Sequence, residues 1–416
     1  MKLDRFSFGI GDRFGCQGRA QLAAIMQARE QGVSIVPVWN KSNREHTIIG
    51  TRPIDVRREA DEAVRACAWS GPYLVDADHI GFSNVDKFVT ASDFFTLDVA
   101  DFIAKAAGAD EVDAFVDRYG SQIMDLQAGG EVAVSEEVSI EHIRLFAAKY
   151  LTAVRQAGKI YRRIVDVKGA GNFVTEVSMD ETDEPQTPAE LLVILAAIAD
   201  EGIAAQTIAP KFTGRFNKGV DYVGDIDAFA REFEADLMVL KAAVRQFGLS
   251  ENLKLSIHSG SDKFSLYGPV GRAIREHGAG LHVKTAGTTW LEELIGLALA
   301  GDDSLAMAAD IYGRALSRFD ELCEPYENVI DIDSSKLPSA GQVRRWDGER
   351  FAAALRHDPD CPDYDSNFRQ LLHVGYKIAA EMRREYTDML QRYEDAIAPH
   401  VTANLFERHI QPIFMA

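Results

Sequence analysis

Short runs of β-branched and aromatic residues alternate with amphipathic helical patterns along most of this chain. Polar or ionisable residues follow nearly every run before the next helical pattern begins. This alternation is typical of βα units that build a parallel sheet, and eight such units predict an α/β fold of the TIM-like (β/α)8 barrel type. The predicted strands are residues 6–10, 33–38, 73–76, 173–177, 204–208, 255–258, 281–284 and 329–332.

The starts of three helices are marked in the sequence. Thr187 is followed by Pro188 and then by Glu190, which is the pattern of an N-cap, a first-turn proline and a capping box. Asp225 and Thr289 are predicted to begin two further helices. Each of these helices follows a predicted strand after a short loop, as a βα unit requires.

The spacing of the predicted strands is regular except between the third and the fourth. Residues 80–171 are predicted to form a large insertion at that point, and residues 340–416 a helical C-terminal extension. Neither an internal repeat nor a low-complexity linker separates these parts. We therefore expect residues 1–416 to form a single elaborated barrel domain.

The charge and the cysteines narrow the function classes. The 416 residues include 45 Lys and Arg against 64 Asp and Glu, and the net charge of −19 disfavours binding to nucleic acid or to an anionic membrane surface. The four cysteines form no C-x-x-C pair, and the longest apolar stretch, residues 191–199, is too short to span a bilayer. We expect a cytoplasmic protein that acts on a small molecule; the sequence is compatible with a homo-oligomer.

Ionisable residues gather where the predicted strands end, which is where a barrel enzyme places its chemistry. Imidazoles and carboxylates from separate strands are suitable ligands for Zn²⁺, Mn²⁺ or Ni²⁺, although no local spacing motif fixes such a site. The candidates are Asp78, His79, Glu176, Asp180, His258 and His282. His373 lies in an apolar helical stretch and is interpreted as a packed residue.

An anionic substrate would need cations within this acidic protein. The basic residues and hydroxyls at the same strand ends are Arg13, Lys211, Ser259, Ser261, Lys263, Lys284 and Thr285. Lys284 has two interpretations, because it could contact an anion or hydroxyl or could act as a Schiff-base nucleophile. The glycines Gly9, Gly11 and Gly15 do not have the spacing of a nucleotide-binding loop.

Several segments of the chain match a known family in order. They are residues 6–14, 76–80, 92–100, 176–182, 258–264 and 282–288, with a weaker match at Leu372-His373-Val374. In these segments the chain resembles the tagaturonate epimerase family, whose members interconvert D-tagaturonate and D-fructuronate. The resemblance implies a TIM barrel, an isomerase that acts on a small sugar acid, and a divalent metal ion.

The implied reaction restricts the mechanism. The two uronates differ at the fourth carbon from the hydroxymethyl end, which is β to the ketone, so simple enolisation cannot invert it. Retro-aldol cleavage, rotation of the aldehyde and re-formation of the bond can do so, and so can hydride transfer with a nicotinamide. Because the chain lacks the Rossmann glycine fingerprint, we favour the retro-aldol route.

This route gives the candidate residues their roles. Glu176, His258 and His282 are predicted to hold a metal ion that acts as a Lewis acid, with His79 as the alternate ligand. Asp78 and Asp180 are the predicted acid/base pair, with Glu176 as a further candidate.

Other residues and functions remain open in the sequence. Arg13, Lys211, Lys263 and Lys284 are available for the substrate carboxylate, and Ser259, Ser261 and Thr285 for its hydroxyls. The alternatives are a Schiff-base aldolase that uses Lys284, a metal-dependent sugar isomerase, and a barrel that binds sugar acids without catalysis.

Overall fold

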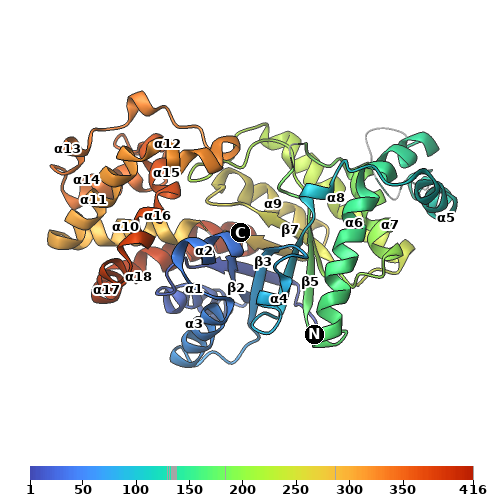
Figure 1. Ribbon diagram of the computed structural model, residues 1–416, viewed down its shortest axis with the longest axis horizontal. Helices are drawn as coiled ribbons and strands as arrows, with labels where there is room; N and C mark the ends of the chain where they lie inside the picture. The colour runs from blue at the N-terminus through green and yellow to red at the C-terminus, as the bar shows by residue number, and fades with distance from the viewer. Residues whose placement is uncertain (129, 131, 133–137, 183, 286, 416) are drawn as a thin grey trace.

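Eight parallel strands close into a barrel in chain order, with β1 paired to both β2 and β8. Figure 1 shows strands at the centre of the molecule with helices on both sides. The computed structural model describes residues 1–128, 130, 132, 138–182, 184–285 and 287–415. The (β/α)8 prediction is therefore confirmed. The strands are β1 Phe6–Gly11, β2 Val36–Ser42, β3 Leu74–Ile80, β4 Phe94–Asp98, β5 Val174–Ser178, β6 Thr207–Ala209, β7 Lys254–His258 and β8 Leu281–Lys284.

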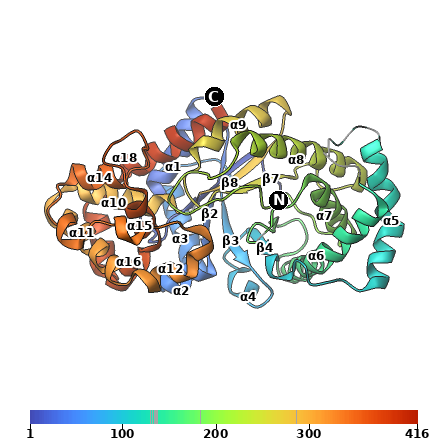
Figure 2. The ribbon, with the colours of Figure 1, turned by 90° about the horizontal axis from the view of Figure 1, so that it is seen from above.

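Helices surround the barrel and extend it at two opposite ends, with α5 to α7 at one end and α10 to α18 at the other (Figure 2). None of the described helices combines the length and apolar character that a membrane span requires. The helices as far as β8 are α1 Gly18–Glu30, α2 Asn43–Ile49, α3 Pro53–Ala66, α4 Val85–Phe88, η1 Ala100–Phe102, α5 Ala109–Ala128, α6 Ile140–Lys168, α7 Pro188–Asp200, α8 Ile226–Phe247 and α9 Phe264–Glu276. After β8 come α10 Thr288–Ala300, α11 Asp302–Ser317, α12 Phe319–Cys323, η2 Glu324–Val329, η3 Ser334–Lys336, α13 Ala340–Val343, α14 Gly348–Leu355, α15 Ser366–Val374, α16 Tyr376–Met382, α17 Arg384–Arg392, α18 Glu394–Ala403 and η4 Asn404–Met415.

Two of the three predicted helix starts are confirmed. Thr187 caps α7 through a capping box with Glu190, and the Asp225 side chain accepts from the backbone of Ala228 at the start of α8. The prediction for Thr289 is wrong, since α10 already begins at Thr288. The Thr289 hydroxyl instead accepts a hydrogen bond from the side chain of Gln21 at 2.8 Å.

One predicted strand is wrong and one strand was not predicted. Residues 329–332 form no strand, because their backbone is bonded elsewhere: Lys218 donates to the Val329 carbonyl, and the Gln370 side chain bonds the backbone of Asp331 on both sides. The missing strand is β4, which follows β3 after only the four-residue helix α4. Residues 81–93 connect the two strands, which is an ordinary length for a parallel crossover, but they contain no long amphipathic helix.

The presence of β4 also moves the large insertion. Residues 80–171 are not one insertion after the third strand, because β4 divides them; the long helices α5 and α6 lie between β4 and β5. The helical region after the barrel likewise begins at α10 and α11, ahead of residue 340. α10 packs against α14 and α18, and α18 and η4 pack against α1, which joins this region to the barrel.

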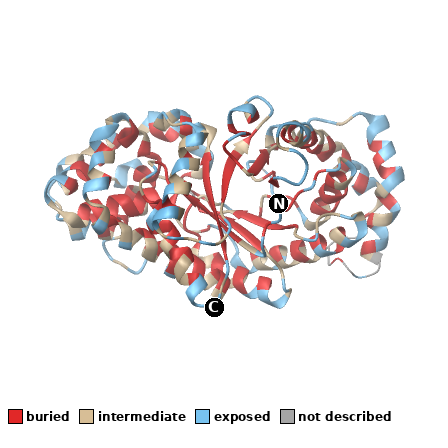
Figure 3. Ribbon diagram, turned by 90° about the horizontal axis from the view of Figure 1, so that it is seen from below, coloured by how far each residue is buried: buried red, intermediate tan, exposed pale blue. Residues whose placement is uncertain are grey.

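The strands are buried along their length, and the exposed residues lie on the outer helices (Figure 3). A small apolar cluster inside the barrel contains Leu74, Phe94 and Val174. The next inward positions on the same strands, two residues later, are Asp76, Thr96 and Glu176. The barrel interior is therefore apolar below and polar toward the carboxyl ends of its strands.

Asp236 on α8 gives a prediction about stability. Its side chain is fully buried, neither oxygen has a hydrogen-bond partner among the described residues, and burial raises its pKa well above the usual value. The folded state therefore binds more protons than the unfolded state as the pH rises above 4, so the free energy of unfolding falls. We expect Asp236→Asn to remove this decrease in the free energy of unfolding, which reaches up to about 1.4 kcal/mol per pH unit.

Denaturant unfolding between pH 5 and pH 8 measures this difference. The exposed Asp227 on the same helix provides the matched control, Asp227→Asn, which should follow the wild-type pH dependence. An Asp236→Asn variant whose stability falls with pH as steeply as that of the wild type would contradict the prediction.

Candidate active site

A lysine inside the barrel joins carboxylates from two other strands. Lys284 on β8 places its Nζ 2.8 Å from Asp76 Oδ2 and 3.0 Å from Asp78 Oδ1, both on β3. The same Nζ lies 2.8 Å from Glu176 Oε1 on β5 and contacts the hydroxyl of Thr96 on β4. Three carboxylates thus surround one ammonium group, so this cluster carries an excess of negative charge.

The cluster fixes the protonation of Lys284. Burial alone would lower the pKa of Lys284, but Asp76, Glu176 and Asp78 raise it well above the usual value. Burial, with the neighbouring carboxylates, raises the pKa of Asp76 to about 7 despite Lys284. A Schiff-base lysine must be neutral to attack a carbonyl, so this environment argues against the aldolase interpretation.

His79 is turned into the barrel mouth by an irregular backbone. The pairing of β3 with β4 shifts register between Ala77 and Ile80, and His79 has a positive φ of 51°. In a regular strand the side chains of Asp78 and His79 would point to opposite faces. Here His79 Nδ1 lies 2.9 Å from Asp78 Oδ1, so the bulge re-aims the ring.

His79, Asp180 and His258 converge on one point. His79 Nε2 lies 3.5 Å from Asp180 Oδ1, and His258 Nδ1 lies 3.1 Å from Asp180 Oδ2. One ligand atom from each residue lies within 4.8 Å of the others. Both nitrogens are buried and lack a hydrogen bond of good geometry among the described residues, as expected of atoms that could bind a metal ion.

The other nitrogen of each ring is held by a carboxylate. Asp78 pairs with His79 Nδ1, and Glu176 Oε1 lies 2.8 Å from His258 Nε2. A carboxylate behind each histidine is the usual support for metal-binding histidines. Although burial alone would lower the pKa of His258, Asp180 and Glu176 raise it to about 9. Asp180 thus faces both histidines while Glu176 lies behind His258; the ligand role predicted for Glu176 and the acid/base role predicted for Asp180 stay predictions.

His282 is not brought into this group. Its ring is fully buried one inward position below Lys284, where Nδ1 lies 2.8 Å from the Ser7 hydroxyl and the ring packs against Phe94. Burial lowers the pKa of His282 to about 3, so the ring is neutral. His79, the predicted alternate, is the histidine that lies with Asp180 and His258 in the group that could hold a metal ion.

The predicted substrate cations besides Lys284 are engaged by the fold. Arg13 Nε lies 3.2 Å from Glu45 Oε1, and the Lys211 ammonium donates to the Thr182 carbonyl. Lys263 is fully buried, and its Nζ lies within hydrogen-bond distance of three backbone carbonyls and the Ser261 hydroxyl. Lys263 is thus held within the fold, and its contact with the substrate stays a prediction.

The predicted hydroxyls lie beneath the rim. The Ser259 hydroxyl donates to the Lys284 carbonyl at 2.8 Å, and the Ser261 hydroxyl accepts from the Gly219 backbone at 2.9 Å. Thr285 is 2% exposed. Ser259 and Ser261 thus bond the backbone of neighbouring segments, and the contacts of all three residues with sugar hydroxyls stay predictions.

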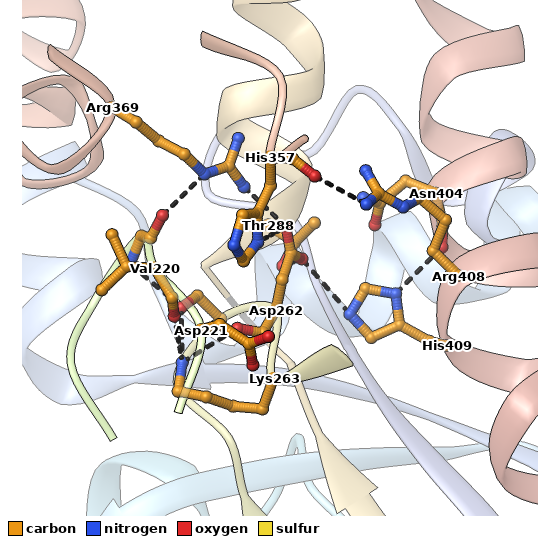
Figure 4. A network of polar contacts seen from close by, with 12 residues as sticks. Val220, Asp221, Asp262, Lys263, Thr288, His357, Arg369, Asn404, Arg408 and His409 are labelled. Carbon is orange, nitrogen blue, oxygen red and sulfur yellow. Dashed lines mark hydrogen bonds and ion pairs between the residues drawn. The ribbon is translucent and has the colours of Figure 1, made fainter. Parts of the chain in front are cut away.

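A buried network fixes the loop that follows His258. Asp262 accepts hydrogen bonds from Arg369 Nη2 at 2.6 Å and from Thr288 Oγ1 at 2.8 Å, and it lies 3.3 Å from a ring nitrogen of both His357 and His409 (Figure 4). Burial alone would raise the pKa of Asp262, but Arg369 and the histidines hold it well below the usual range. The C-terminal helices thereby anchor the β7 loop.

Sequence reasoning missed three residues of the site. Asp76 closes the third predicted strand, but its approach to Lys284 depends on barrel closure. Thr96 and Asp98 belong to β4, which was not predicted. Asp98 lies at the mouth, where burial raises its pKa and the charges of His79 and Asp180 also act on it. The resemblance over residues 92–100 was the available signal for this strand.

The model of the tagaturonate epimerase family matches residues 1–412 of the chain. The chain belongs to the tagaturonate epimerase family. Members of this family are carbohydrate epimerases, a class of isomerase, so the expected enzyme class is confirmed.

Individual relatives agree with this membership. The tagaturonate/fructuronate epimerase of Thermotoga maritima is 28% identical over 427 residues, which cover 98% of this chain and 80% of that protein. A glycerol complex of the fructuronate-tagaturonate epimerase of Cohnella laeviribosi is 25% identical, with a TM-score of 0.76, 98% of this chain covered and 82% of the other. The native structure of the same epimerase is 24% identical, with a TM-score of 0.77. The match covers 99% of this chain and 82% of that protein, and it shows the same fold.

Proposed function

We propose that this chain interconverts D-tagaturonate and D-fructuronate at the carboxyl ends of the barrel strands. The observation that carries the proposal is the convergence of His79, Asp180 and His258 beside the Lys284 carboxylate cluster, in a chain of the tagaturonate epimerase family. The substrate of the Thermotoga maritima relative, as its name gives it, supports the choice of uronate.

His79, Asp180 and His258 would hold a divalent ion, for which Zn²⁺, Mn²⁺ and Ni²⁺ are all suitable. When bound, such an ion supplies Lewis-acid polarisation of the substrate's ketone region. Asp78 and Glu176 support the fit, since each holds a histidine by its second nitrogen and so fixes the ring that faces Asp180.

Asp78 and Asp98 are our candidates for the two proton transfers of a retro-aldol route. The fourth hydroxyl must lose a proton before cleavage, and the oxygen must regain one on the opposite side after the aldehyde rotates. Asp78 Oδ1 lies 3.0 Å from the Lys284 ammonium, which stabilises the negative charge of Asp78. Asp98 has a raised pKa and can therefore carry the proton that is returned.

Product analysis tests the proposed function. Protein loaded with Mn²⁺, Zn²⁺ or Ni²⁺ is incubated with D-tagaturonate, and NMR is expected to detect D-fructuronate. Formation of an aldose would favour a sugar isomerase, and binding without any turnover would favour a non-catalytic barrel. Either result would overturn the proposal.

The label at the inverted carbon tests the route. Substrate that carries deuterium at the fourth carbon should give D-fructuronate with full retention of the label, because retro-aldol cleavage never breaks that carbon–hydrogen bond. NMR of the product measures the retained fraction. Exchange of the deuterium with solvent would exclude the retro-aldol route.

A further inference from the structure

Each cation predicted from the sequence to hold the substrate carboxylate already has partners in the fold. Lys284 is surrounded by carboxylates, Lys263 is buried among carbonyls, and Arg13 is paired with Glu45. Lys211 donates to a backbone carbonyl. An anionic substrate of this acidic protein therefore requires a cation from elsewhere at the barrel mouth.

Two other cations flank one aromatic ring at the mouth. Lys218 lies in the loop between β6 and α8, and Arg44 lies near the start of α2, directly after β2. Lys218 Nζ and the guanidinium carbon of Arg44 are each 5.8 Å from the centroid of the Tyr326 ring. In the parts of the chain that the structure describes, no carboxylate lies within ion-pair distance of either cation.

The surroundings of Lys218 leave its ammonium group without a compensating negative charge. Burial lowers the pKa of Lys218, and the nearby charges of Arg13 and Arg44 lower it further. Glu181 acts in the opposite direction but is exposed and forms no ion pair with Lys218 in the described structure. A bound carboxylate would raise the pKa of Lys218 again, because an opposite charge beside an ammonium group favours its protonated form.

Polar groups with spare hydrogen-bonding capacity adjoin the two cations. The Tyr326 and Tyr376 hydroxyls lie 3.4 Å apart, and because one proton suffices between them, the other can be donated to a ligand. The Arg13 guanidinium lies 3.9 Å from the Tyr376 ring centroid and holds that ring in place. His373 is 1% exposed, and neither ring nitrogen has a hydrogen-bond partner within the described residues.

The cation pair adjoins the catalytic groups. Glu181, whose charge acts on both Arg44 and Lys218, directly follows Asp180 in the chain. Lys218 Nζ is 3.9 Å from the position that a Cβ on Gly260 would take, and Gly260 is two residues beyond His258. Two residues span at most about 7 Å, so Lys218 Nζ lies within about 12 Å of the His258 backbone.

We propose that Lys218 and Arg44, with the hydroxyl of Tyr326, bind the carboxylate of the substrate and so select a hexuronate over the neutral ketohexose. This inference rests on the proposed function, because it names the anionic end of the same substrate. The ketone then faces His79, Asp180 and His258, and the carboxylate faces Lys218 at the other end of the six-carbon chain. These two residues determine affinity and specificity and take no part in bond cleavage.

Steady-state kinetics and calorimetry test the assignment. Lys218→Met and Arg44→Met are each expected to raise the KM for D-tagaturonate about 10- to 100-fold while kcat changes less than about threefold. D-tagatose carries a hydroxymethyl group in place of the carboxylate, so its calorimetric Kd should stay within about threefold of wild type. Lys218→Arg should restore most of the affinity for D-tagaturonate, and Arg215→Met, which removes an exposed cation from the same loop, should leave both ligands unaffected.

The possible results separate this inference from the proposed function. A wild-type protein that epimerises D-tagaturonate, with Lys218→Met and Arg44→Met at wild-type KM, would overturn the inference alone. An equal loss of affinity for D-tagatose and D-tagaturonate would overturn it as well. If the wild type binds uronate through Lys218 without turning it over, the inference stands and the proposed function fails.

Discussion

Replacing Lys284 by Met should reduce kcat at least about 10³-fold and lower the free energy of unfolding by about 3–5 kcal/mol. The reason is the loss of the only ammonium that touches Asp76, Asp78 and Glu176 in the described structure. Their buried charges would then lack compensation. Part of the stability should return below pH 5, because protonation of these carboxylates removes the repulsion.

Denaturant unfolding at pH 5 and pH 8, together with single-turnover kinetics, measures both effects. Lys254 provides the matched control, since it is also a buried lysine of the barrel interior but donates to the Asp4 carbonyl. Lys254→Met should cost about 1 kcal/mol and leave kcat within a few-fold of wild type. Equal losses in both variants would show that Lys284 acts through packing rather than through its charge.

His79→Gln and His258→Gln should each weaken binding of a divalent metal at least about 100-fold and lower kcat to a similar extent. Each substitution removes one of the three atoms that converge beside Asp180. His282→Gln should still bind metal at wild-type stoichiometry, because His282 is bonded to Ser7 below the mouth. Calorimetric titration with Mn²⁺ and metal analysis of the purified variants measure this difference independently of activity.

The pH dependence of metal affinity follows from the same contacts. Without metal, Asp180 and Glu176 raise the pKa of His258 to about 9, so the ring is protonated at neutral pH. A ligand nitrogen must lose that proton, so metal affinity should increase from pH 6 to pH 9 with release of protons. Loss of metal from His282→Gln together with retention by His79→Gln would instead support the ligand set predicted from the sequence.

Seven of the eight strands were predictable because their hydrophobic runs stand out from the helical patterns, although β2 and β6 each begin three residues later than predicted. β4 was not predicted because its connection from β3 contains only the short helix α4, so no regular alternation of strand and helix patterns marks it. The run at 329–332 has the composition of a strand, but its backbone bonds to Lys218 and to the Gln370 side chain. Local composition does not reveal which partner a backbone will find.

The site was predictable as a set of residues at strand ends, while the roles within it were not. Strand alternation places His282 and Lys284 on the same inward face, but it does not give their depth, which excludes His282 from the group. The turning of His79 depends on a bulge and a positive φ that no residue in the sequence requires. Lys218 was missed because it follows no predicted strand directly and reaches the mouth only through its loop.

The Asp262 network sets the order in which the active site can be completed during synthesis. Asp262 positions the loop after His258, and its partners include Arg369 on α15 and His409 in η4, both of which follow β8 in the chain. A ribosome that has released all eight strands has therefore not yet released every residue that fixes this loop. The nascent barrel should acquire its shape before it acquires a fully ordered His258 loop, and activity should appear only after η4 has been synthesised.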